Sequence, residues 1–485
     1  MAGEVSIVSE GNTMKTGMKT GRSTFPWRSF LKALAAIAVP IALQNLLTTT
    51  ASMVDTMMVA PLGQLSVGAI GLCAQFSSLM FSCYWGFVGG GSLFFAQYWG
   101  SRESDGIERS YGMTLCCMMT VALIFSGLAL LAPEWVMRLY TDKVSIQRIG
   151  VQYLRIVGFA YPMQVLAMCM SALLRSTERV RIPLVASCAS VSANLLLNWV
   201  FIYGKFGIPA MGVRGAALAT ACAAAVNVLV IYIAAKVSGY PFLFHVRNHF
   251  RWTGTHTKAY FVKCFPIICN ELLIGVGNMV INVTLGRQNE EIIAALAVFR
   301  ILEGLVIGFF AGFASAASVL VGKCVGAGEL ETAYQRAKRL VYLCSGVIFT
   351  AGLVVLAFHK PILTAMSLSG ASFRAGITML TIYIFVSLIR MGNWIQNDTF
   401  RASGDAVTGT VLEIVFMYVM VLPAVLITGF AIKAPYWVIF LCCYIDEPIR
   451  YVLMQIHLYS AKWIRPVTDM GLAALPEFRK QRVAR

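Results

Sequence analysis

Long apolar stretches dominate this chain. Runs of about 20 apolar residues recur between residues 34 and 458, and short polar segments separate them. A helix of about 20 residues is long enough to cross the hydrocarbon core of a bilayer. The pattern therefore predicts an all-α polytopic membrane protein with twelve transmembrane helices, near residues 34–59, 66–97, 110–132, 149–173, 183–204, 214–236, 260–285, 292–322, 338–358, 377–400, 409–430 and 435–458.

Charged residues are scarce and unevenly placed. They make up 13% of the chain, about half the share of a typical soluble domain (~25%). Lys and Arg gather in the two termini and in every second loop, as the positive-inside rule describes for cytoplasmic segments. We therefore expect a multi-pass protein of the plasma membrane with both termini cytoplasmic. The net charge of +17 then reflects topology and contact with anionic membrane lipids, not nucleic acid.

An internal repeat divides the chain in two. At a shift of 226 residues, "VPIAL" returns as "FPIIC", and "GFVGGGSLFFAQYWGSRE" (86–103) returns as "GFASAASVLVGKCVGAGE" (312–329). At the same shift, "LLRST" with Arg175 returns as "TFRAS" with Arg401. One offset that holds at three distant places indicates a duplication.

Six helices in each repeat give the two halves the same orientation, related by an axis along the membrane normal. Duplicated folds of this kind occur in transporters, whose substrate path lies between the halves near mid-membrane. The longest polar loop joins the halves. The predicted parts are a cytoplasmic N-terminal tail (1–32), an N-lobe (33–236), an inter-lobe cytoplasmic loop (237–259), a C-lobe (260–458) and a basic cytoplasmic tail (459–485).

A stripe of polar residues runs along the first apolar segment. Gln44, Thr48, Ser52 and Asp55 follow one another at steps of four, four and three residues, so they lie on one helix face. A lone carboxylate facing lipid costs about 2.5–3.5 kcal/mol on insertion scales, so the stripe is expected to face the bundle interior or a wet cavity. Asp55 is therefore predicted as a cation or proton site. The alternative is an aspartate that meets water at the helix end.

Amides and a hydroxyl recur in the fifth and sixth segments. Asn194 and Asn198 lie one helical turn apart in "NLLLN", and Thr220 follows in "GAALAT". With Asp55, these residues offer the oxygen ligands that a small hard cation prefers. We predict a cation-coupling site of these four residues, with Asp55, Asn194 and Asn198 as the ligands of a possible Na⁺. The spacing is equally compatible with interhelical hydrogen bonds.

The seventh segment mirrors the first. Glu271, Asn278 and Asn282 share a helix face, and with Gln44 and Thr48 they are candidates for the substrate cavity or a second coupling site. For Glu271 the alternative is a structural ion pair or exposure to the cytoplasm.

Arg390 and Asn393 of the tenth segment complete this second candidate set. A buried arginine most often pairs with a nearby acid, and Glu271 is a candidate partner of Arg390. Two i,i+3 pairs are expected to be structural: Asp398 with Arg401, and Glu447 with Arg450.

The chain lacks the common catalytic motifs. HExxH, a Walker lysine loop, GxSxG and paired histidines are absent from the sequence. We therefore expect no enzyme activity and no cofactor, with Na⁺ or H⁺ as the coupling ion. "GFVGGGS" is Gly-rich but lies within an apolar span with no Lys-Ser/Thr after it, which indicates a flexible or closely packed helix rather than a phosphate loop.

These residues give the chain a family resemblance. The first segment reads "P…Q…VD…LG" from Pro40 to Gly63, the fifth holds "NLLLN", and "GIPAMGVRGAALAT" leads into the sixth. With the two-times-six repeat, they make the chain resemble the multidrug and toxic compound extrusion (MATE) family over roughly residues 30–460.

The resemblance implies two six-helix lobes around a central cavity and cation-coupled export by rocking between inward- and outward-open states. It implies a central coupling role for Asp55, with Asn194, Asn198 and Thr220 carried over as its neighbours. Some members have Asp where this chain has Asn198, which leaves fewer titratable groups in the N-lobe. Some members also carry a helix 7 glutamate and a helix 10 aspartate. Glu271 lies about one turn early for the first, and the second has no clear counterpart.

The resulting hypothesis is a secondary antiporter that exports organic, cationic or amphipathic compounds against Na⁺ or H⁺ entry. We expect a monomer that acts on small organic substrates. The alternative is a flippase or exporter of lipid-linked or polysaccharide precursors with a related duplicated fold. A large anionic headgroup needs several basic residues in the cavity, and the residues considered for that role are Arg155 and Arg390. The sequence offers no catalytic constellation for a membrane-embedded enzyme. A non-transporting scaffold or receptor would not require buried acidic residues in a duplicated chain.

Overall fold

Helices form the whole regular structure of the described chain. The computed structural model describes residues 25–366 and 368–483, and this part contains no strand. The first half comprises α1 (Trp27–Val59), α2 (Gln64–Ser101), α3 (Ser104–Leu131), α4 (Pro133–Tyr140), α5 (Val144–Val157), α6 (Ala160–Ser176), α7 (Arg181–Tyr203) and α8 (Val213–Val237). The second half comprises α10 (Gly254–Leu285), α11 (Glu290–Gly326), α12 (Leu330–Ala357), α13 (His359–Ala365), α14 (Gly370–Ala402), α15 (Thr408–Phe416), α16 (Leu422–Leu426), α17 (Tyr436–Cys442) and α18 (Glu447–Ser460). Two helices lie outside the halves: α9 (Val246–His249) between them and α19 (Asp469–Val483) after them.

Most of these helices are long and apolar enough to span a membrane. Over the described residues, ten helical segments meet that description, and the bent pair α5–α6 makes an eleventh span. The twelfth predicted segment, 435–458, is divided into α17 and α18 next to the acidic residues Asp446 and Glu447. The predicted all-α fold of twelve spans in two lobes is confirmed, with a break in the last span.

The fourth span bends where its repeat copy stays straight. α5 and α6 meet at 51°, since Pro162 has no N–H to donate to the Gly158 carbonyl. The Ser126 hydroxyl donates to that carbonyl at 2.8 Å instead. The equivalent of the bend in the second half, residues 384–388, contains neither Gly nor Pro, and it lies within the single helix α14.

The helix boundaries repeat at the predicted shift of 226 residues. α3 maps onto α12 residue for residue, and α2 maps onto α11 to within one residue. α1 likewise maps onto α10, and α4 onto α13. The duplication indicated by short sequence identities therefore extends to the arrangement of whole helices.

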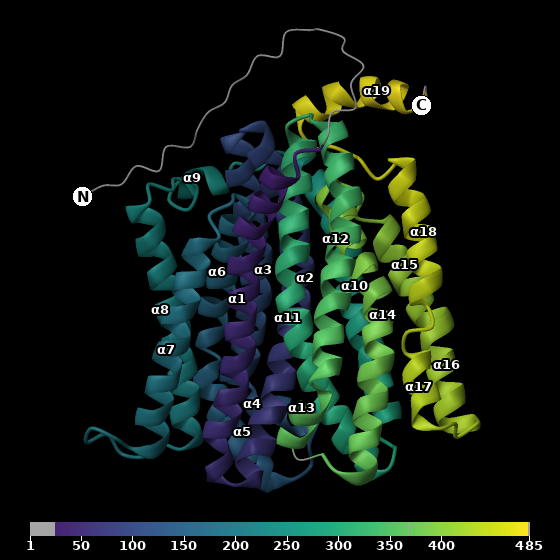
Figure 1. Cartoon of the computed structure of the whole chain (residues 1–485). Helices are drawn as coiled ribbons and strands as arrows, with labels where there is room; N and C mark the ends of the chain where they lie inside the picture. Colours follow the sequence, from purple (N-terminus) through teal and green to yellow (C-terminus); the bar gives the residue numbers. More distant parts are fainter. Residues whose placement is uncertain (1–24, 367, 484–485) are drawn as a thin grey trace.

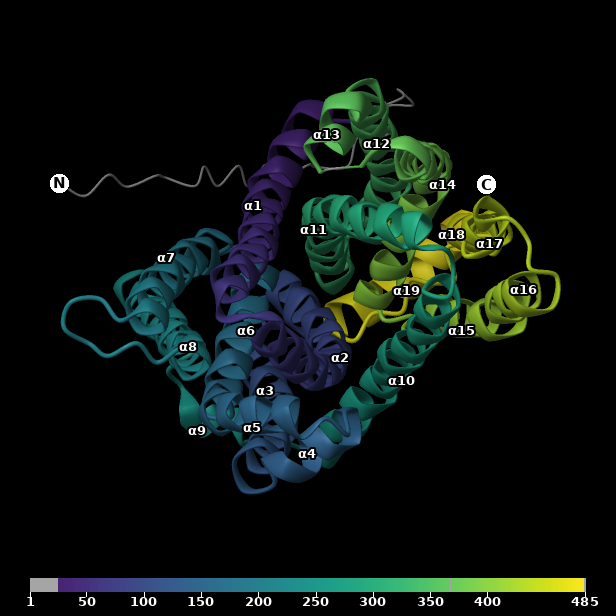
Figure 2. The same cartoon turned by 90° about the horizontal axis from the view of Figure 1, so that it is seen from below.

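The two halves form separate lobes that meet along four helices. Figure 2 shows α1–α8 on one side and α10–α18 on the other. At the boundary, α1 packs on α11, and α2 packs on both α10 and α11. Two inter-lobe hydrogen bonds, Gln97–Ala402 and Lys323–Glu178, lie near the ends of α2 and α11, which are at the upper end in Figure 1. A third, from Asn45 Nδ2 to Gly308 O (3.1 Å), lies halfway along α11. These bonds thus join the lobes from the upper end to the middle of the bundle.

The segment between the lobes packs on the N-lobe. Glu108 of α3 accepts a hydrogen bond from Asn248 Nδ2 (2.7 Å) and lies 2.7 Å from His245 Nδ1. Residues 1–24 of the predicted N-terminal tail lie outside the described residues, and α1 begins at Trp27. The predicted C-terminal tail contains α19.

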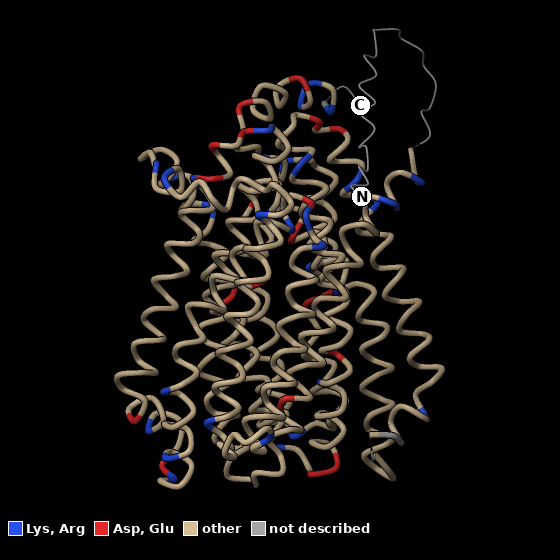
Figure 3. The backbone as a smooth tube through the Cα atoms, turned by 90° about the vertical axis from the view of Figure 1, so that its left-hand side faces the viewer, with Lys and Arg blue, Asp and Glu red and all other residues tan. Residues whose placement is uncertain are grey.

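Both ends of the described chain lie on the same side of the bundle. α1 begins and α18 ends at the upper end in Figure 1, where α9 and α19 also lie. Figure 3 shows the charged residues gathered at the two ends of the bundle, with few between them. From the positive-inside rule we predict that the upper end is cytoplasmic.

Epitope tags test this topology. A tag inserted in the 204–212 loop, between α7 and α8, should bind antibody on intact cells. A tag in the 237–259 segment should bind only after permeabilisation. Binding of both tags on intact cells would contradict the prediction, since these two positions flank a single span, α8.

Candidate coupling site

Asp55 lies near the lower end of α1, four residues before the helix ends at Val59. A 3₁₀ turn, Ala60–Leu62, follows, with Pro61 inside it. Gly63 then adopts a φ of +95°, a conformation that L side chains rarely adopt. The "LG" of the sequence motif therefore forms the turn that ends the first span just beyond Asp55.

Asp55 and two asparagines of α7 form one hydrogen-bonded cluster. Asn198 Nδ2 donates to Asp55 Oδ1 at 2.7 Å and to Asn194 Oδ1 at 3.1 Å. The amide tip of Asn194 also lies 2.6 Å from Asp55 Oδ1 and 3.2 Å from Oδ2. Both asparagines are buried and Asp55 is partly buried. The structure thus brings together three of the four residues predicted for the coupling site.

One oxygen of this cluster has no partner. Asn198 Oδ1 is buried and accepts no hydrogen bond from the described residues. Buried polar atoms are nearly always satisfied in proteins, so a small cation is a fitting partner for this carbonyl oxygen.

The fourth predicted residue, Thr220, donates its hydroxyl to Ala216 O of its own helix at 3.0 Å. Tyr153 of α5, which sequence reasoning missed, lies beside Thr220 and near Asp55.

Gln44 belongs to a different group of contacts from Asp55. Its Nε2 donates to Ser187 Oγ at 2.7 Å, and its Oε1 accepts from Arg175 Nη2 at 2.7 Å. Thr48 is exposed, and its hydroxyl donates to a carbonyl of its own helix at 2.9 Å. The polar stripe of α1 is therefore divided. Gln44 ties α1 to α6 and α7, and Asp55 joins the cluster with α7. Thr48 and Ser52, which lie between them, are exposed and donate only to carbonyls of their own helix.

Charged residues form a chain of ion pairs inside the C-lobe. Glu271 Oε1 accepts from Arg401 Nη1 at 3.2 Å, and Arg401 Nη2 lies 3.8 Å from Glu413 Oε2. Glu413 Oε1 lies 3.9 Å from Arg450 Nη1, and Arg450 Nη2 donates to Glu447 Oε2 at 2.7 Å. The predicted Glu447–Arg450 pair is confirmed as one member of this chain.

The chain of ion pairs continues to α11. Arg390 Nη1 donates to Glu303 Oε1 at 2.7 Å, and Arg390 Nε lies 3.7 Å from Glu447 Oε1. Arg300 Nη1 donates to Glu303 Oε2 at 2.6 Å, and Arg300 Nη2 donates to Asn282 Oδ1 at 3.0 Å. Arginines and glutamates therefore alternate from α11 to α10 across the lobe.

Two predicted ion pairs are wrong. Arg390 does not pair with Glu271, because Glu271 pairs with Arg401. Arg401 follows Arg390 by eleven residues on α14, so the two arginines lie about 16 Å apart along the helix axis. Arg401 also lacks the predicted ion pair with Asp398, since its guanidinium reaches α10 and α15 instead.

The remaining candidates of the C-lobe differ in their surroundings. Asn393 is buried, and its Nδ2 donates to Glu447 O at 3.0 Å and to Glu447 Oε2 at 2.7 Å. It therefore supports the ion-pair chain. Asn278 is exposed. Sequence reasoning missed Glu303, Arg300 and Glu413, although Arg300 and Glu303 show the i,i+3 spacing of a helical ion pair within an apolar segment.

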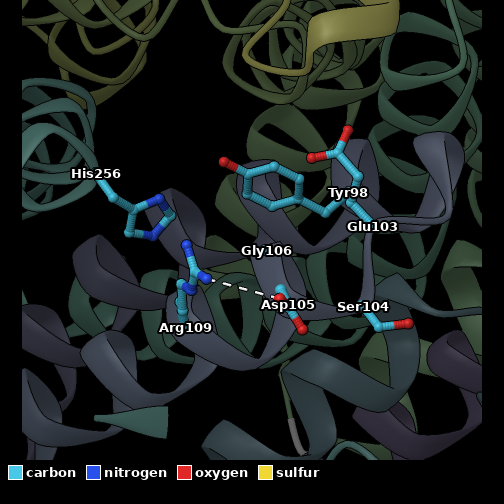
Figure 4. Close-up of a pocket in the computed structure, with 7 residues that line it drawn as sticks. All are labelled: Tyr98, Glu103, Ser104, Asp105, Gly106, Arg109 and His256. Carbon is cyan, nitrogen blue, oxygen red and sulfur yellow. Dashed lines mark ion pairs between the residues drawn. The ribbon is translucent and has the colours of Figure 1, made fainter. Parts of the chain in front are cut away.

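A hollow of about 410 Å³ lies away from these residues. Its lining, drawn in Figure 4, consists of Tyr98, Glu103, Ser104, Asp105, Gly106, Arg109 and His256. Arg109 Nη2 pairs with Asp105 Oδ2 at 3.6 Å, and His256 Nε2 lies 3.2 Å from Ser110 Oγ. The hollow thus lies at the α2–α3 turn and the start of α10, and none of the predicted site residues lines it.

Both repeats match one family of known proteins. The MatE family model matches residues 40–200 and 266–427, so the two matches begin at Pro40 and Pro266, which the repeat aligns. The chain belongs to the multidrug and toxic compound extrusion (MATE) family. This confirms the resemblance, and it makes the chain a member of a family of multi-pass membrane transporters.

Individual relatives resemble this MATE protein over most of its length. It is 20% identical over 437 residues to the uncharacterized transporter YisQ of Bacillus subtilis (strain 168), covering 89% of this chain and 95% of the relative. It is 25% identical over 397 residues to the probable multidrug resistance protein NorM of Neisseria meningitidis, covering 77% of this chain and 81% of the relative. A crystallised variant of the Vibrio cholerae MATE transporter VcmN has the same fold, with a TM-score of 0.81 at 15% identity over 92% of this chain and 99% of that chain.

Proposed function

We propose that this MATE protein is a cation-coupled secondary antiporter of the plasma membrane that exports organic, cationic or amphipathic compounds by alternating access. The observation that carries the proposal is the cluster of Asp55, Asn194 and Asn198, in which two amides hold one carboxylate inside a membrane-spanning bundle. An ionisable group at membrane depth is costly and marks an ion or proton path by default. With both termini cytoplasmic, Asp55 lies toward the outer side of the membrane.

Small organic molecules are the proposed substrates. The NorM relative is named a probable multidrug resistance protein, and this chain has 23 Met and 12% aromatic residues, which suit an adaptable apolar cavity. The flippase alternative needs free basic groups for an anionic headgroup. Arg155 pairs with Glu134 at 2.7 Å and Arg390 pairs with Glu303 at 2.7 Å, so neither is free. The ion pairs of these two arginines therefore support drug export more than binding of an anionic headgroup.

Proton coupling is supported by the hydrogen bonds of the Asp55 cluster. The amide tip of Asn194 lies 2.6 Å from Asp55 Oδ1. Its NH₂ group can donate to the ionised carboxylate, and its oxygen can accept a hydrogen bond from a protonated Asp55, because an amide carries both donors and an acceptor. The charge of Asp55 thus changes the contact between α1 and α7.

Na⁺ is the alternative coupling ion that we propose for the same place. Asp55, Asn194 and Asn198 would supply carboxylate and amide oxygens, with Asn198 Oδ1 as the unsatisfied ligand. One carboxylate balances one positive charge, so Na⁺ and H⁺ would compete for Asp55. We propose no further cofactor. Since one chain supplies both lobes, we propose that it works as a monomer in contact with membrane lipids.

Accumulation of a fluorescent organic cation such as ethidium tests the proposed function. Cells that express the protein should accumulate less dye than control cells, and dissipating the sodium and proton gradients should abolish the difference. Equal accumulation in both kinds of cells, for a panel of organic cations, would contradict drug export.

Asn198→Ala is expected to weaken sodium-dependent transport more than proton-dependent transport. The substitution removes the unsatisfied carbonyl oxygen but leaves Asp55 free to take up a proton. We expect the sodium concentration for half-maximal effect to rise on the order of tenfold, which corresponds to about 1.4 kcal/mol. Transport in proteoliposomes at several pH values measures this. The sodium effect should weaken at falling pH, as protonated Asp55 no longer balances the ion.

Asn248→Ala in the inter-lobe segment is the matched control, since it removes an amide that contacts Glu108 at the other end of the bundle. It should leave the sodium dependence unchanged. If sodium has no effect at any pH, or if Asn198→Ala keeps the wild-type sodium effect, the site is placed wrongly. Glu271 then becomes the better candidate.

A further inference from the structure

Two polar contacts join the lobes at the upper end, and the repeat relates them. Gln97 of α2 and Lys323 of α11 hold the same place in the two repeats. Gln97 Nε2 donates to Ala402 O at the end of α14 (2.8 Å), and Lys323 Nζ pairs with Glu178 Oε2 just after α6 (2.7 Å). Each lobe therefore contacts the end of the fourth span of the other lobe.

The ends of α2 and α11 approach each other at backbone distance here. A Cβ atom on Gly326 would collide with the carbonyl oxygen of Gln97, and one on Gly100 would collide with that of Lys323. Only glycine therefore permits the contact. Gln97 is fully buried. We call this meeting point of α2 and α11 the upper gate, because opening the upper end has to separate the two helices at this place.

A segment after the last span contacts both sides of the upper gate. Residues 461–483, which we call the C-terminal strap, lie beyond the residues that match the family model. Val467 N donates to Gln97 Oε1 at 2.8 Å, and the buried Thr468 donates its hydroxyl to Gly326 O at 2.7 Å. Val467 also packs on a buried cluster that includes Phe94 of α2. Figure 1 shows α19, the helix of the strap, lying across the upper end of the bundle.

The strap is anchored to the C-lobe where it begins. Arg465 N donates to a backbone carbonyl after α14 at 2.9 Å, and Arg465 Nη1 lies 3.2 Å from Asp405 Oδ1. Burial acts to raise the pKa of Asp405, but the hydrogen bonds from His457 and Thr408 and the charge of Arg465 hold this pKa below its ordinary value. Asp405 therefore stays ionised at neutral pH and keeps its ion pair with the strap.

The far end of the strap is anchored to α12. Phe478 is buried, and the guanidinium carbon of Arg482 lies 3.6 Å from the centre of the Tyr334 ring. Arg482 Nη2 also lies 2.9 Å from Glu331 Oε2. Both ends of the strap thus belong to the C-lobe, while its middle contacts Gln97 of the N-lobe.

We propose that the C-terminal strap is a latch that stabilises the closed state of the upper gate and releases Gln97 before the lobes part at this end. The inference rests on the alternating access proposed above. The strap holds one residue from each lobe, Gln97 and Gly326, at the place where the two backbones touch. On opening, water replaces these hydrogen bonds, so the net cost per bond is small. The latch therefore sets the population of open molecules rather than preventing the motion.

A native cysteine reports the opening of this interface. Cys264 of α10 is fully buried, and Gly90 of α2 packs directly on its sulfur. Cys169 is also fully buried, but it lies in a hydrophobic cluster formed by the N-lobe and the segment packed on it. A maleimide reagent and peptide mass spectrometry then measure two events separately: labelling of Cys264 for the parting of the lobes, and labelling of Cys169 for unfolding of the N-lobe.

Thr468→Val and Gln97→Leu are the test variants. The first removes the hydroxyl that donates to Gly326 O and accepts from Gly471 N at 3.2 Å, and the second removes both bonds of Gln97. We expect Cys264 to be labelled about ten times faster in each variant than in the wild type. Thr120→Val is the matched control, because Thr120 is an exposed residue of α3 whose hydroxyl donates to its own helix at 2.9 Å. It should label at the wild-type rate.

Two results would overturn the latch. The first is unchanged labelling of Cys264 in both variants. The second is labelling that rises equally at Cys264 and Cys169, which would show that the strap supports the fold and does not hold the gate. The measurement does not depend on transport. If the protein exports nothing and Cys264 still responds, the latch holds and the proposed function fails.

Discussion

Asp55→Asn is expected to abolish active export while the protein remains folded and inserted. The amide keeps the shape of the side chain and its place beside Asn194 and Asn198. It neither takes up a proton nor balances a cation, so the coupling step is lost. Efflux of an organic cation should fall to the level of cells without the transporter, a loss on the order of tenfold or more. Dye efflux normalised to the amount of protein in the membrane measures this.

Asp105→Asn is the matched control for this substitution. Asp105 lies at the start of α3, its side chain is 75% exposed, and it pairs with Arg109 at 3.6 Å. It should retain wild-type efflux, because an exposed ion pair contributes little. Wild-type efflux by a well-expressed Asp55→Asn protein would show that this carboxylate is not the coupling group.

Arg390→Met is expected to destabilise the folded protein by about 1–3 kcal/mol, the usual cost of removing one partner of a buried polar group. The substitution removes one partner of Glu303 (2.7 Å) and one of Glu447 (3.7 Å), and each glutamate keeps a second arginine. The double variant Arg390→Met with Glu303→Gln should recover most of the loss, since the amide carries no charge. Thermal unfolding of the purified protein in detergent, followed by tryptophan fluorescence, measures both variants.

Arg155→Met provides the comparison for Arg390→Met. Arg155 pairs with Glu134 at 2.7 Å, but the two side chains are 59% and 50% exposed. Its loss should cost less than about 1 kcal/mol. If both variants unfold at the same temperature, the ion-pair chain of the C-lobe does not stabilise the protein.

We propose that this ion-pair chain makes the C-lobe a rigid body. The conformational change that accompanies cation coupling would then take place at the Asp55 cluster of the N-lobe.

Local sequence properties are sufficient to predict most of the fold. The length of an apolar run decides whether a helix can cross a bilayer, and the repeat shift carries the order of helices from one half to the other. The division of the last span into α17 and α18 was not predictable in this way. The acidic residues at this break, Asp446 and Glu447, pair with Arg450 at 3.4 Å and 2.7 Å. The length of the apolar run does not predict this break. Ion pairs of this kind offset the cost of placing charged residues within a span, so the charges alone do not exclude a continuous helix.

The candidate site was likewise predictable from local sequence properties only in part. Asp55 and the two asparagines of α7 were predictable, since helical spacing places Asn194 and Asn198 on one face and a buried carboxylate requires polar partners. The partners of Arg390 were not predictable, because Glu303 comes from α11 and the depth of each side chain in the bundle depends on how the helices pack. The C-terminal strap was missed for a similar reason. Its contact with Gln97 joins residues 370 positions apart, and no local pattern marks it.

Gradient-driven transport by purified protein tests cation coupling at Asp55 most directly. Wild-type protein and Asp55→Asn are reconstituted in proteoliposomes, a sodium or proton gradient is imposed, and the movement of a labelled organic cation is followed. We predict that the gradient drives the organic cation in the opposite direction through the wild-type protein, and that Asp55→Asn gives no gradient-driven movement. Wild-type transport that is independent of both gradients, or gradient-driven transport by Asp55→Asn, would contradict coupling at this residue.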